Sequence, residues 1–298
     1  MPTLFSFPEY ARISESLRGL SGLNPGEFSL VRYPNQELHV ELRNTVAGER
    51  CVILGSVAPP DSQMVSLLLL AHTLRKEGAG RIIALLPYLA YAREDKSKPG
   101  QSLATAWMGA LLRASGLDEI WTVDVHSKHD LELLSLPLTS LSPAVLFGEC
   151  LEKLGLTDVS FVAPDQGAVA RCEAVRSAAG QSSGDIVYFR KERTASGIVH
   201  HERVGQVRRR AVVVDDVLDT GATLVSACER LVSAGVAELY ICVTHGLFAG
   251  KRWRDLWSLP LQHIFCTDTI PACTSIADPR ITALPVGPLL VAQLAAIL

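Results

Sequence analysis

Residues Val212–Thr223 read VVVDDVLDTGAT, and this stretch decides the fold. Its three valines predict a short buried strand, because β-branched residues favour a pleated backbone. The strand ends in two adjacent carboxylates, Asp215 and Asp216, and the short loop Asp219–Thr223 then leads directly into a helix. In an open α/β sheet, ligands bind at the carboxyl ends of strands, where such loops and helix starts converge.

The loop has the features of a phosphate-binding site. A helix start offers free N–H groups and the positive end of the helix dipole. Gly221 lets the backbone approach an anion closely, and Thr220 and Thr223 can donate hydrogen bonds from their hydroxyls. The two carboxylates can accept hydrogen bonds from the vicinal hydroxyls of a sugar whose phosphate the loop holds. For DTG alone, a turn with an Asp N-cap is the alternative, and the full string favours phosphate binding.

Short apolar strands alternate with longer helical stretches along the rest of the chain. Predicted strands lie at Arg50–Gly55, Arg81–Leu86, Glu119–Val125, Ser160–Pro164, Ile186–Phe189, Ala211–Asp215 and Glu238–Thr244. Predicted helices lie at Met64–Glu77, Leu103–Ser115, Ala144–Leu154, Ala168–Ala179 and Thr223–Ala234. This order predicts an α/β protein with mainly parallel sheets flanked by helices.

A break in the pattern near Ser142–Pro143 divides the chain into two halves of similar strand and helix order. We expect residues 1–143 to form one domain and residues 144–285 to form a second, followed by an apolar C-terminal helix whose face needs a partner. The polar stretches Gly180–Gly184 and Thr194–Arg210 are expected to be irregular loops.

Composition restricts the class of protein. The 298 residues are 48% hydrophobic and 20% charged, which is typical of a globular protein. The net charge of −3 gives no electrostatic basis for binding nucleic acid or an anionic membrane. No apolar run approaches the roughly 20 residues that span a bilayer, and the N-terminus lacks a secretion signal, so we expect a cytoplasmic protein. The seven scattered cysteines form no C-x-x-C pair and are expected to be reduced and buried.

The string VVVDDVLDTGAT resembles the phosphoribosyl-pyrophosphate signature that type I phosphoribosyltransferases share with ribose-phosphate pyrophosphokinases. Five further segments resemble the pyrophosphokinases specifically, in that family's order and spacing. They are PYLAYAREDK at Pro87–Lys96, TVDVHS at Thr122–Ser127, APDQGAVAR at Ala163–Arg171, VTHGLFAG at Val243–Gly250 and TDTIP at Thr267–Pro271. The resemblance implies two phosphoribosyltransferase-like α/β domains with the active site between them. It also implies that the C-terminal helix, residues 286–298, joins the first domain.

The resemblance also implies the reaction, in which a diphosphate moves from ATP to C1 of ribose 5-phosphate. It assigns Asp215 and Asp216 to the ribose hydroxyls. The 5-phosphate would be wrapped by Asp219, Thr220, Gly221, Ala222 and Thr223.

Mg²⁺ is the implied cofactor, with His126 and Asp165 as its protein contacts. Because Mg²⁺ prefers oxygen ligands, the role of His126 comes from the resemblance alone. Judged from the residues themselves, a strand-end histidine and a helix N-cap at Asp165 are alternatives. Lys191 and Arg193 match a Lys and an Arg on a family loop that closes on the β-phosphate, where cations stabilise developing charge. A solvated charge cluster is the alternative for this pair.

The adenine site implied by the family departs from its pattern in this chain. The matching residues are Tyr33, Glu37, Arg93, Glu94 and Asp95. In RYPNQE, at Arg32–Glu37, Asn35 stands where the family has Asp and Gln36 where it has Gly. Glu94 replaces a glutamine, and an ionised carboxylate can accept hydrogen bonds but cannot donate one.

Two other functions share parts of this pattern. A phosphoribosyltransferase has the same sugar-phosphate loop, but the presence of His126, Asp165, Lys191 and Arg193 argues against it. A catalytically silent paralogue that regulates active pyrophosphokinase subunits is favoured only by RYPNQE and Glu94. We therefore expect an enzyme whose partners are ATP, ribose 5-phosphate and further copies of itself, as a dimer or larger homo-oligomer.

Overall fold

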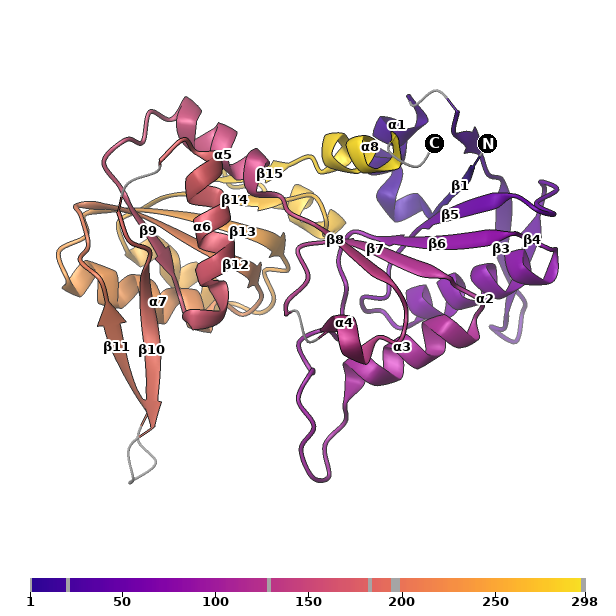
Figure 1. Cartoon of the computed structure of the whole chain (residues 1–298), viewed down its shortest axis with the longest axis horizontal. Helices are drawn as coiled ribbons and strands as arrows, with labels where there is room; N and C mark the ends of the chain where they lie inside the picture. Colours follow the sequence, from indigo (N-terminus) through magenta and orange to yellow (C-terminus); the bar gives the residue numbers. More distant parts are fainter. Residues whose placement is uncertain (1, 20–21, 128–129, 182–183, 194–198, 296–298) are drawn as a thin grey trace. The chain divides into compact units, whose positions relative to one another are not determined.

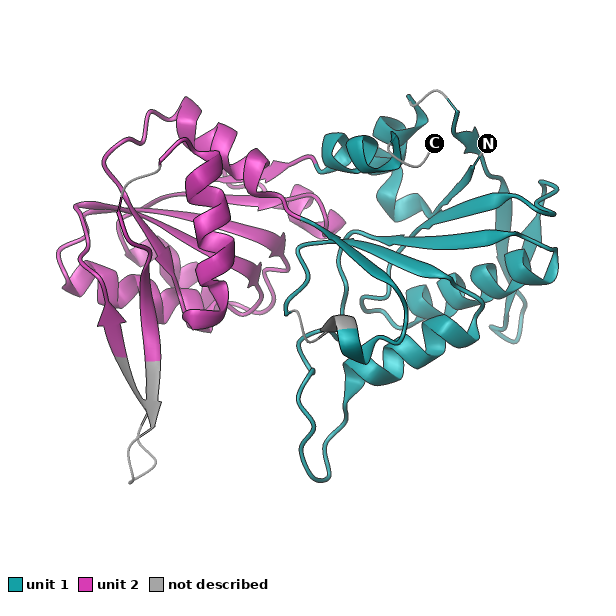
Figure 2. Ribbon diagram, in the orientation of Figure 1, with its two compact units in different colours: residues 1–141, 286–298 teal, residues 142–285 magenta. Residues whose placement is uncertain are grey.

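The computed structural model describes residues 2–19, 22–127, 130–181, 184–193 and 199–295, with the side chains at 130–131, 191–193 and 199–201 outside the description. The chain forms two compact units, shown in Figure 2. Unit 1 comprises Met1–Leu141 and Val286–Leu298, and unit 2 comprises Ser142–Pro285.

Unit 1 is built on a six-stranded sheet in the order β2-β1-β5-β6-β7-β8, in which all neighbouring strands are parallel (Figure 1). The strands are β1 (Thr3–Ser6), β2 (Asn24–Pro25), β5 (Arg50–Leu54), β6 (Arg81–Leu86), β7 (Glu119–Val123) and β8 (Leu138–Leu141). A separate antiparallel hairpin consists of β3 (Phe28–Arg32) and β4 (Leu38–Leu42).

The helices of unit 1 are η1 (Pro8–Tyr10), α1 (Ala11–Arg18), α2 (Ser62–Lys76), α3 (Ala104–Ala114), α4 (Asp130–Leu133) and α8 (Gly287–Ala295). The C-terminal helix α8 packs on α1 (Figure 1). A side chain at Gly287 would place its Cβ 2.5 Å from Ser16 Oγ, so a glycine is needed for this close approach.

Unit 2 is built on a seven-stranded sheet in the order β11-β10-β9-β12-β13-β14-β15. Its strands are β9 (Ser160–Ala163), β10 (Val187–Arg193), β11 (Val199–Val204), β12 (Arg210–Leu218), β13 (Glu238–Gly246), β14 (Leu261–Thr267) and β15 (Ile281–Leu284). Its helices are α5 (Ala144–Lys153), η2 (Gln166–Ala168), α6 (Val169–Ala178), α7 (Ala222–Ser233), η3 (Arg252–Ser258) and η4 (Pro271–Ser275). Every pair of neighbouring strands is parallel except β10 with β11.

Side chains of β12 alternate between two hydrophobic cores, one on each face of this sheet. Val212 and Val214 pack with α5 and α6, whereas Ala211 and Val213 pack with α7. This alternation follows from the two-residue period of a strand, and burial on both faces explains why the strand is uniformly apolar. The same two layers of helices fix the position of the carboxyl end of β12.

The structure confirms the predicted α/β class with two mainly parallel sheets. The prediction of a loop over Thr194–Arg210 was wrong for Val199–Val204, which form β11 and pair with β10 from Tyr188↔Val204 to Arg193↔Val199. Residues 205–209 are irregular as predicted, and residues 194–198 lie outside the described part of the chain. β12 is also longer than predicted, since Val217 and Leu218 continue its pairing with β13. In both cases hydrogen bonding to a neighbouring strand forms the strand, which the apolar pattern of the segment did not predict.

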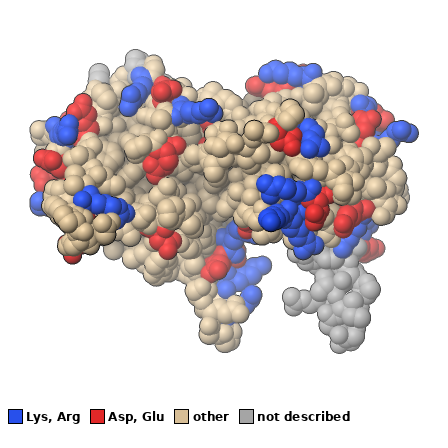
Figure 3. Space-filling model, turned by 180° about the vertical axis from the view of Figure 1, so that it is seen from behind, with Lys and Arg blue, Asp and Glu red and all other residues tan. Residues whose placement is uncertain are grey.

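Among the helices of the described part, none combines the length and the apolar character that crossing a bilayer requires. Lys and Arg side chains are spread among Asp and Glu side chains over the face that Figure 3 shows. The seven cysteines are free thiols, and burial raises the pKa of Cys51 to about 11 and that of Cys228 to about 12.

Candidate functional site

The carboxyl end of β12 carries two adjacent carboxylates. Asp216 is buried and Asp215 is half-buried. The backbone N–H of Asp216 donates to Asp215 Oδ1 at 3.0 Å. Burial, followed by the neighbouring charge of Asp216, raises the pKa of Asp215 well above its ordinary value, while the charge of Arg171 acts in the opposite direction. Two carboxylates held together favour a ligand that supplies hydrogen-bond donors or positive charge.

The loop Asp219–Thr223 follows this pair and opens α7 without a side-chain cap. Gly221 is the N-cap residue, in the left-handed conformation with φ +87°. The side chains of Thr220 and Thr223 are exposed, whereas Gly221 is buried. Because glycine cannot cap the helix with a side chain, the N–H groups of the first turn are left for an anion, which the helix dipole also favours. The structure thus places an uncapped helix start shortly after the carboxylate pair.

Asp165 lies at the carboxyl end of β9, the neighbour of β12 in the sheet. Its Oδ1 accepts a hydrogen bond from the N–H of Gly167 at 2.9 Å, so Asp165 is the N-cap of η2. This cap uses only Oδ1, and Oδ2 is a suitable oxygen ligand for a hard cation such as Mg²⁺. Since the carboxyl ends of parallel strands meet at one edge, Asp165 and the carboxylate pair near the end of β12 belong to the same edge of the sheet.

Lys191 and Arg193 occupy the far end of β10, where the backbone pairs Lys191 with His201 and Arg193 with Val199 of β11. The side chains of both residues lie outside the described part of the chain. The described backbone therefore places the two predicted cations on an antiparallel ribbon at an edge of the sheet of unit 2.

A buried polar network lies at the carboxyl ends of β13 and β14, within VTHGLFAG and TDTIP. His245 Nδ1 lies 2.9 Å from Thr269 Oγ1, which lies 2.9 Å from Thr267 Oγ1. Thr267 Oγ1 in turn donates to the carbonyl oxygen of Thr244 at 2.6 Å. In strand register, His245 lies opposite Val217, just beyond the carboxylate pair. Sequence reasoning noted both segments as motifs but missed this link, because it depends on how two strands pair.

In unit 1, two predicted groups of site residues meet after β6 and β7. Asp95 is buried, and its Oδ2 accepts a hydrogen bond from Ser127 Oγ at 3.0 Å. This bond places Arg93 and Asp95 near the loop that carries the exposed His126. Glu94 is exposed, and its Oε2 accepts a hydrogen bond from Ser102 Oγ at 2.8 Å. Glu94 thus uses its acceptor capacity on a neighbouring hydroxyl.

Tyr33 and Glu37 lie at the turn of the β3–β4 hairpin, whereas Arg93, Glu94 and Asp95 lie in the segment that follows β6 of the six-stranded sheet. The N–H of Tyr33 donates to the carbonyl oxygen of Glu37 at 2.9 Å. The exposed ring of Tyr33 lies 5.6 Å from the ring of His39. Gln36 has φ +72°, a conformation that favours the glycine expected there.

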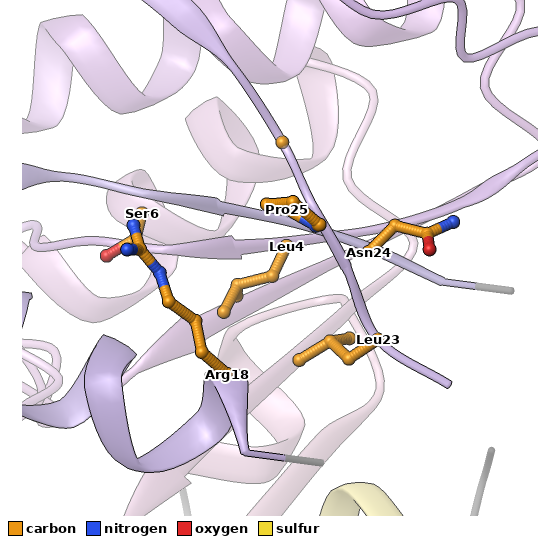
Figure 4. Close-up of a pocket in the computed structure, with 7 residues that line it drawn as sticks. Leu4, Ser6, Arg18, Leu23, Asn24 and Pro25 are labelled. Carbon is orange, nitrogen blue, oxygen red and sulfur yellow. The ribbon is translucent and has the colours of Figure 1, made fainter. Parts of the chain in front are cut away.

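The described residues contain no cluster of three or more His, Cys, Asp or Glu side chains able to hold a metal ion. A cavity of about 280 Å³ in unit 1, lined by Leu4, Arg18 and the start of β2 among others, contains none of the predicted site residues (Figure 4).

Comparisons with known proteins agree with this arrangement. A family model described as the N-terminal domain of ribose phosphate pyrophosphokinase matches residues 3–116. A model of the phosphoribosyl synthetase-associated domain matches residues 191–297.

Similar proteins and one solved structure cover nearly the whole chain. The ribose-phosphate pyrophosphokinase of Campylobacter jejuni is 31% identical over 261 residues, which cover 86% of this chain and 83% of that protein. The Pasteurella multocida enzyme of the same name is 32% identical over 275 residues, covering 90% and 86%. The fold matches a crystal structure of phosphoribosylpyrophosphate synthetase from Mycobacterium smegmatis with a TM-score of 0.87, at 24% identity, over 99% of this chain and 98% of that one. The chain therefore belongs to the ribose-phosphate pyrophosphokinase family.

Proposed function

We propose that the protein is a ribose-phosphate diphosphokinase that transfers the β,γ-diphosphate of MgATP to the 1-hydroxyl of ribose 5-phosphate. The products are phosphoribosyl pyrophosphate and AMP. The single observation that carries this proposal is the carboxylate pair at Asp215 and Asp216 directly before an uncapped helix start at Gly221. One end of this arrangement suits vicinal hydroxyls and the other suits a phosphate.

In the proposed reaction, the 1-hydroxyl oxygen of the sugar attacks the β-phosphorus and the bond to the α-phosphate oxygen breaks. AMP leaves, and the hydroxyl proton passes to solvent. No general base is assigned, so positioning and electrostatic stabilisation account for catalysis. Asp215 and Asp216 hold the ribose hydroxyls, and Asp219–Thr223 hold the 5-phosphate. Hydrogen bonds from two sides fix the sugar, so its 1-hydroxyl has one orientation.

We assign ATP to Tyr33, Glu37, Arg93, Glu94 and Asp95, with the ring of Tyr33 stacking on the base. The ring is available for stacking because it is 45% exposed. His126 and Asp165 are the proposed protein contacts of Mg²⁺. Bound with the nucleotide, Mg²⁺ would offset the charge of the phosphates. Lys191 and Arg193 are proposed to stabilise the charge that develops on the transferred diphosphate.

Release of AMP from MgATP, measured with and without ribose 5-phosphate, tests the proposal. We expect AMP formation that depends on the sugar and falls by about 100-fold or more in Lys191→Ala, as for the loss of a group that stabilises transition-state charge. Lys153→Ala is the matched control, since Lys153 is an exposed lysine of the same unit and no part of the proposed site. An equal loss in both variants would contradict the role of Lys191.

A catalytically silent regulatory paralogue is the second candidate, because Gln36 occupies a left-handed turn position and Glu94 already pairs with Ser102. Ribose 5-phosphate binding without AMP formation from ATP, CTP or GTP would favour it. Consumption of phosphoribosyl pyrophosphate in the presence of a nucleobase would instead favour a phosphoribosyltransferase.

A further inference from the structure

The phosphate loop is held in place by the segment that follows β13. The N–H groups of Leu247 and Phe248 both donate to the carbonyl oxygen of Leu218, at 2.9 and 3.0 Å. The N–H of Ala249 donates to the carbonyl oxygen of Asp219 at 3.1 Å. Three hydrogen bonds therefore fix the point at which the chain leaves β12 and enters the loop.

The middle of the loop rests on Trp253 of η3. A Cβ added at Gly221 would lie 2.6 Å from Trp253 Cα and 2.8 Å from Trp253 Cβ. No real Cβ atom tolerates contacts this short with backbone, so the two chain segments are in the closest contact that glycine allows. The position of Gly221, and with it the N–H groups of the first turn of α7, is therefore coupled to that of Trp253.

Trp253 is itself held by aromatic and cationic neighbours. Its buried ring lies 5.0 Å from the ring of Phe248 and 6.2 Å from that of Trp257, edge to face in both cases. The guanidinium of Arg254 lies 4.5 Å from the Trp253 ring, and that of Arg280 lies 3.7 Å from the Trp257 ring. Edge-to-face pairs and cations over rings are favourable geometries.

Two locally unfavourable features occur at this same place. Phe248 has φ +51°, a conformation that side chains other than glycine rarely adopt. The buried indole N–H of Trp253 has no hydrogen-bond partner among the described residues. Strained backbone and unsatisfied donors persist only where the surrounding structure imposes them, and they concentrate at functional sites.

We propose that Trp253 is a positioning residue for the phosphate loop: its ring anchors the main chain and Cβ that Gly221 contacts, and this anchoring sets the affinity of the loop for the phosphate of ribose 5-phosphate. This inference rests on the proposed function. Trp253 acts through the loop and does not touch the substrate. The residues assigned to the nucleotide belong to unit 1, whereas Gly221 and Trp253 belong to unit 2, so we expect the effect of Trp253 to fall on the sugar phosphate.

Trp253→Leu and Trp253→Phe test the inference, with Trp257→Phe as the matched control. Trp257 lies in the same short helix and packs on the ring of Trp253. The close contact of Gly221, however, is with Trp253 and not with Trp257. In Trp253→Leu we expect the KM for ribose 5-phosphate to rise about tenfold. The KM for ATP is expected to change less than about twofold. Trp253→Phe keeps the edge-to-face packing on Phe248 and is expected to recover most of the affinity.

Intrinsic fluorescence gives a second readout, because the protein has only four tryptophans. We expect ribose 5-phosphate to change the emission of the wild type and of Trp257→Phe but not that of Trp253→Phe. A merely structural role would lower the melting temperature without separating the two KM values. Equal rises in both KM values, no rise in a folded Trp253→Leu, or the same behaviour in Trp257→Phe would overturn the inference.

The test also separates this inference from the proposed function. If the wild type binds ribose 5-phosphate without forming AMP, the proposed function fails. Titration calorimetry of the sugar phosphate into wild type and Trp253→Leu then decides the inference alone. Equal affinities would overturn it, and weaker binding by the variant would support it. If Trp253→Leu does not fold, Trp253→Met carries the comparison, because it also lacks the ring that packs on Phe248 and Trp257. If the wild type binds no ribose 5-phosphate, both proposals are refuted.

Discussion

Asp215→Asn is expected to make the protein more stable at neutral pH and to weaken its binding of ribose 5-phosphate. In the wild type, burial and the charge of Asp216 raise the pKa of Asp215 well above its ordinary value. Asparagine keeps the oxygen that accepts the N–H of Asp216, a bond of 3.0 Å, and adds an N–H₂ group that can donate to the Asp216 carboxylate. The substitution thus removes a repulsion without removing the local hydrogen bond.

The size of the gain follows from the placement of the two carboxylates. Two like charges about 4 Å apart repel by about 4 kcal/mol at an effective dielectric constant near 20. Arg171 and partial protonation of the pair offset part of this repulsion. We therefore expect a net gain of about 1 to 2 kcal/mol in the free energy of unfolding, or roughly 2 to 8 °C in melting temperature.

The pH dependence has a definite sign. Because the folded-state pKa of Asp215 is raised, the unfolded chain releases the proton first as the pH rises above the ordinary Asp value of 3.8, and the wild type loses stability from there upward. The advantage of the Asn variant is therefore small near pH 4 and reaches its full size above the folded-state pKa.

Thermal unfolding followed by circular dichroism between pH 4.5 and 8 measures this difference. Asp278→Asn is a control of opposite sign, because hydrogen bonds from Arg280 lower the pKa of Asp278. That control is expected to lose stability at neutral pH. The affinity of Asp215→Asn for ribose 5-phosphate is expected to fall about tenfold, as for the loss of a charge-assisted hydrogen bond. A variant less stable than wild type at pH 8, or a gain that does not vary with pH, would refute the reasoning.

Two further predictions concern the departures from the family pattern in unit 1. Gln36→Gly is expected to stabilise the protein by up to about 1 kcal/mol, because a left-handed backbone costs a non-glycine residue about 1 to 2 kcal/mol and the flexibility of glycine in the unfolded chain offsets part of that. Urea unfolding measures this gain, and an unchanged midpoint would show that the turn is unstrained. Glu94→Gln restores an amide that both donates and accepts, so we expect the KM for ATP to fall by about threefold to tenfold while the KM for ribose 5-phosphate stays constant. A parallel fall in both KM values would mean that Glu94 acts elsewhere than on the nucleotide.

Local pattern was sufficient for the buried parallel strands and their helices. The apolar stretch of β6 and the three valines of β12 are strands in the structure, because strands covered on both faces need uniformly apolar side chains. The β3–β4 hairpin and β11 were not predicted. VHHERV in β11 is polar, and it forms a strand because β10 supplies the hydrogen-bonding partner. The sequence of a single segment gives little indication of such pairing, because it depends on the neighbouring strand.

The proposed phosphate loop could be predicted from the sequence because all its parts lie within twelve consecutive residues, Val212–Thr223. Strand, carboxylates, glycine and helix start are fixed by local backbone geometry, and the structure keeps them in that order. The raised pKa of Asp215 was not foreseeable in the same way, because burial by elements on both faces of the sheet is its main cause.

The sequence by itself determined the α/β class and the family, because motifs and periodicity are local properties of the chain. Tertiary structure alone decided which segment supports that loop. Trp253 meets Gly221 only because β13 pairs beside β12 and returns the chain through Phe248 to η3. It also decided that Asp95 meets Ser127 across two strand ends. These contacts join residues far apart in the chain, and close packing of a folded interior, which no single segment encodes, brings them together.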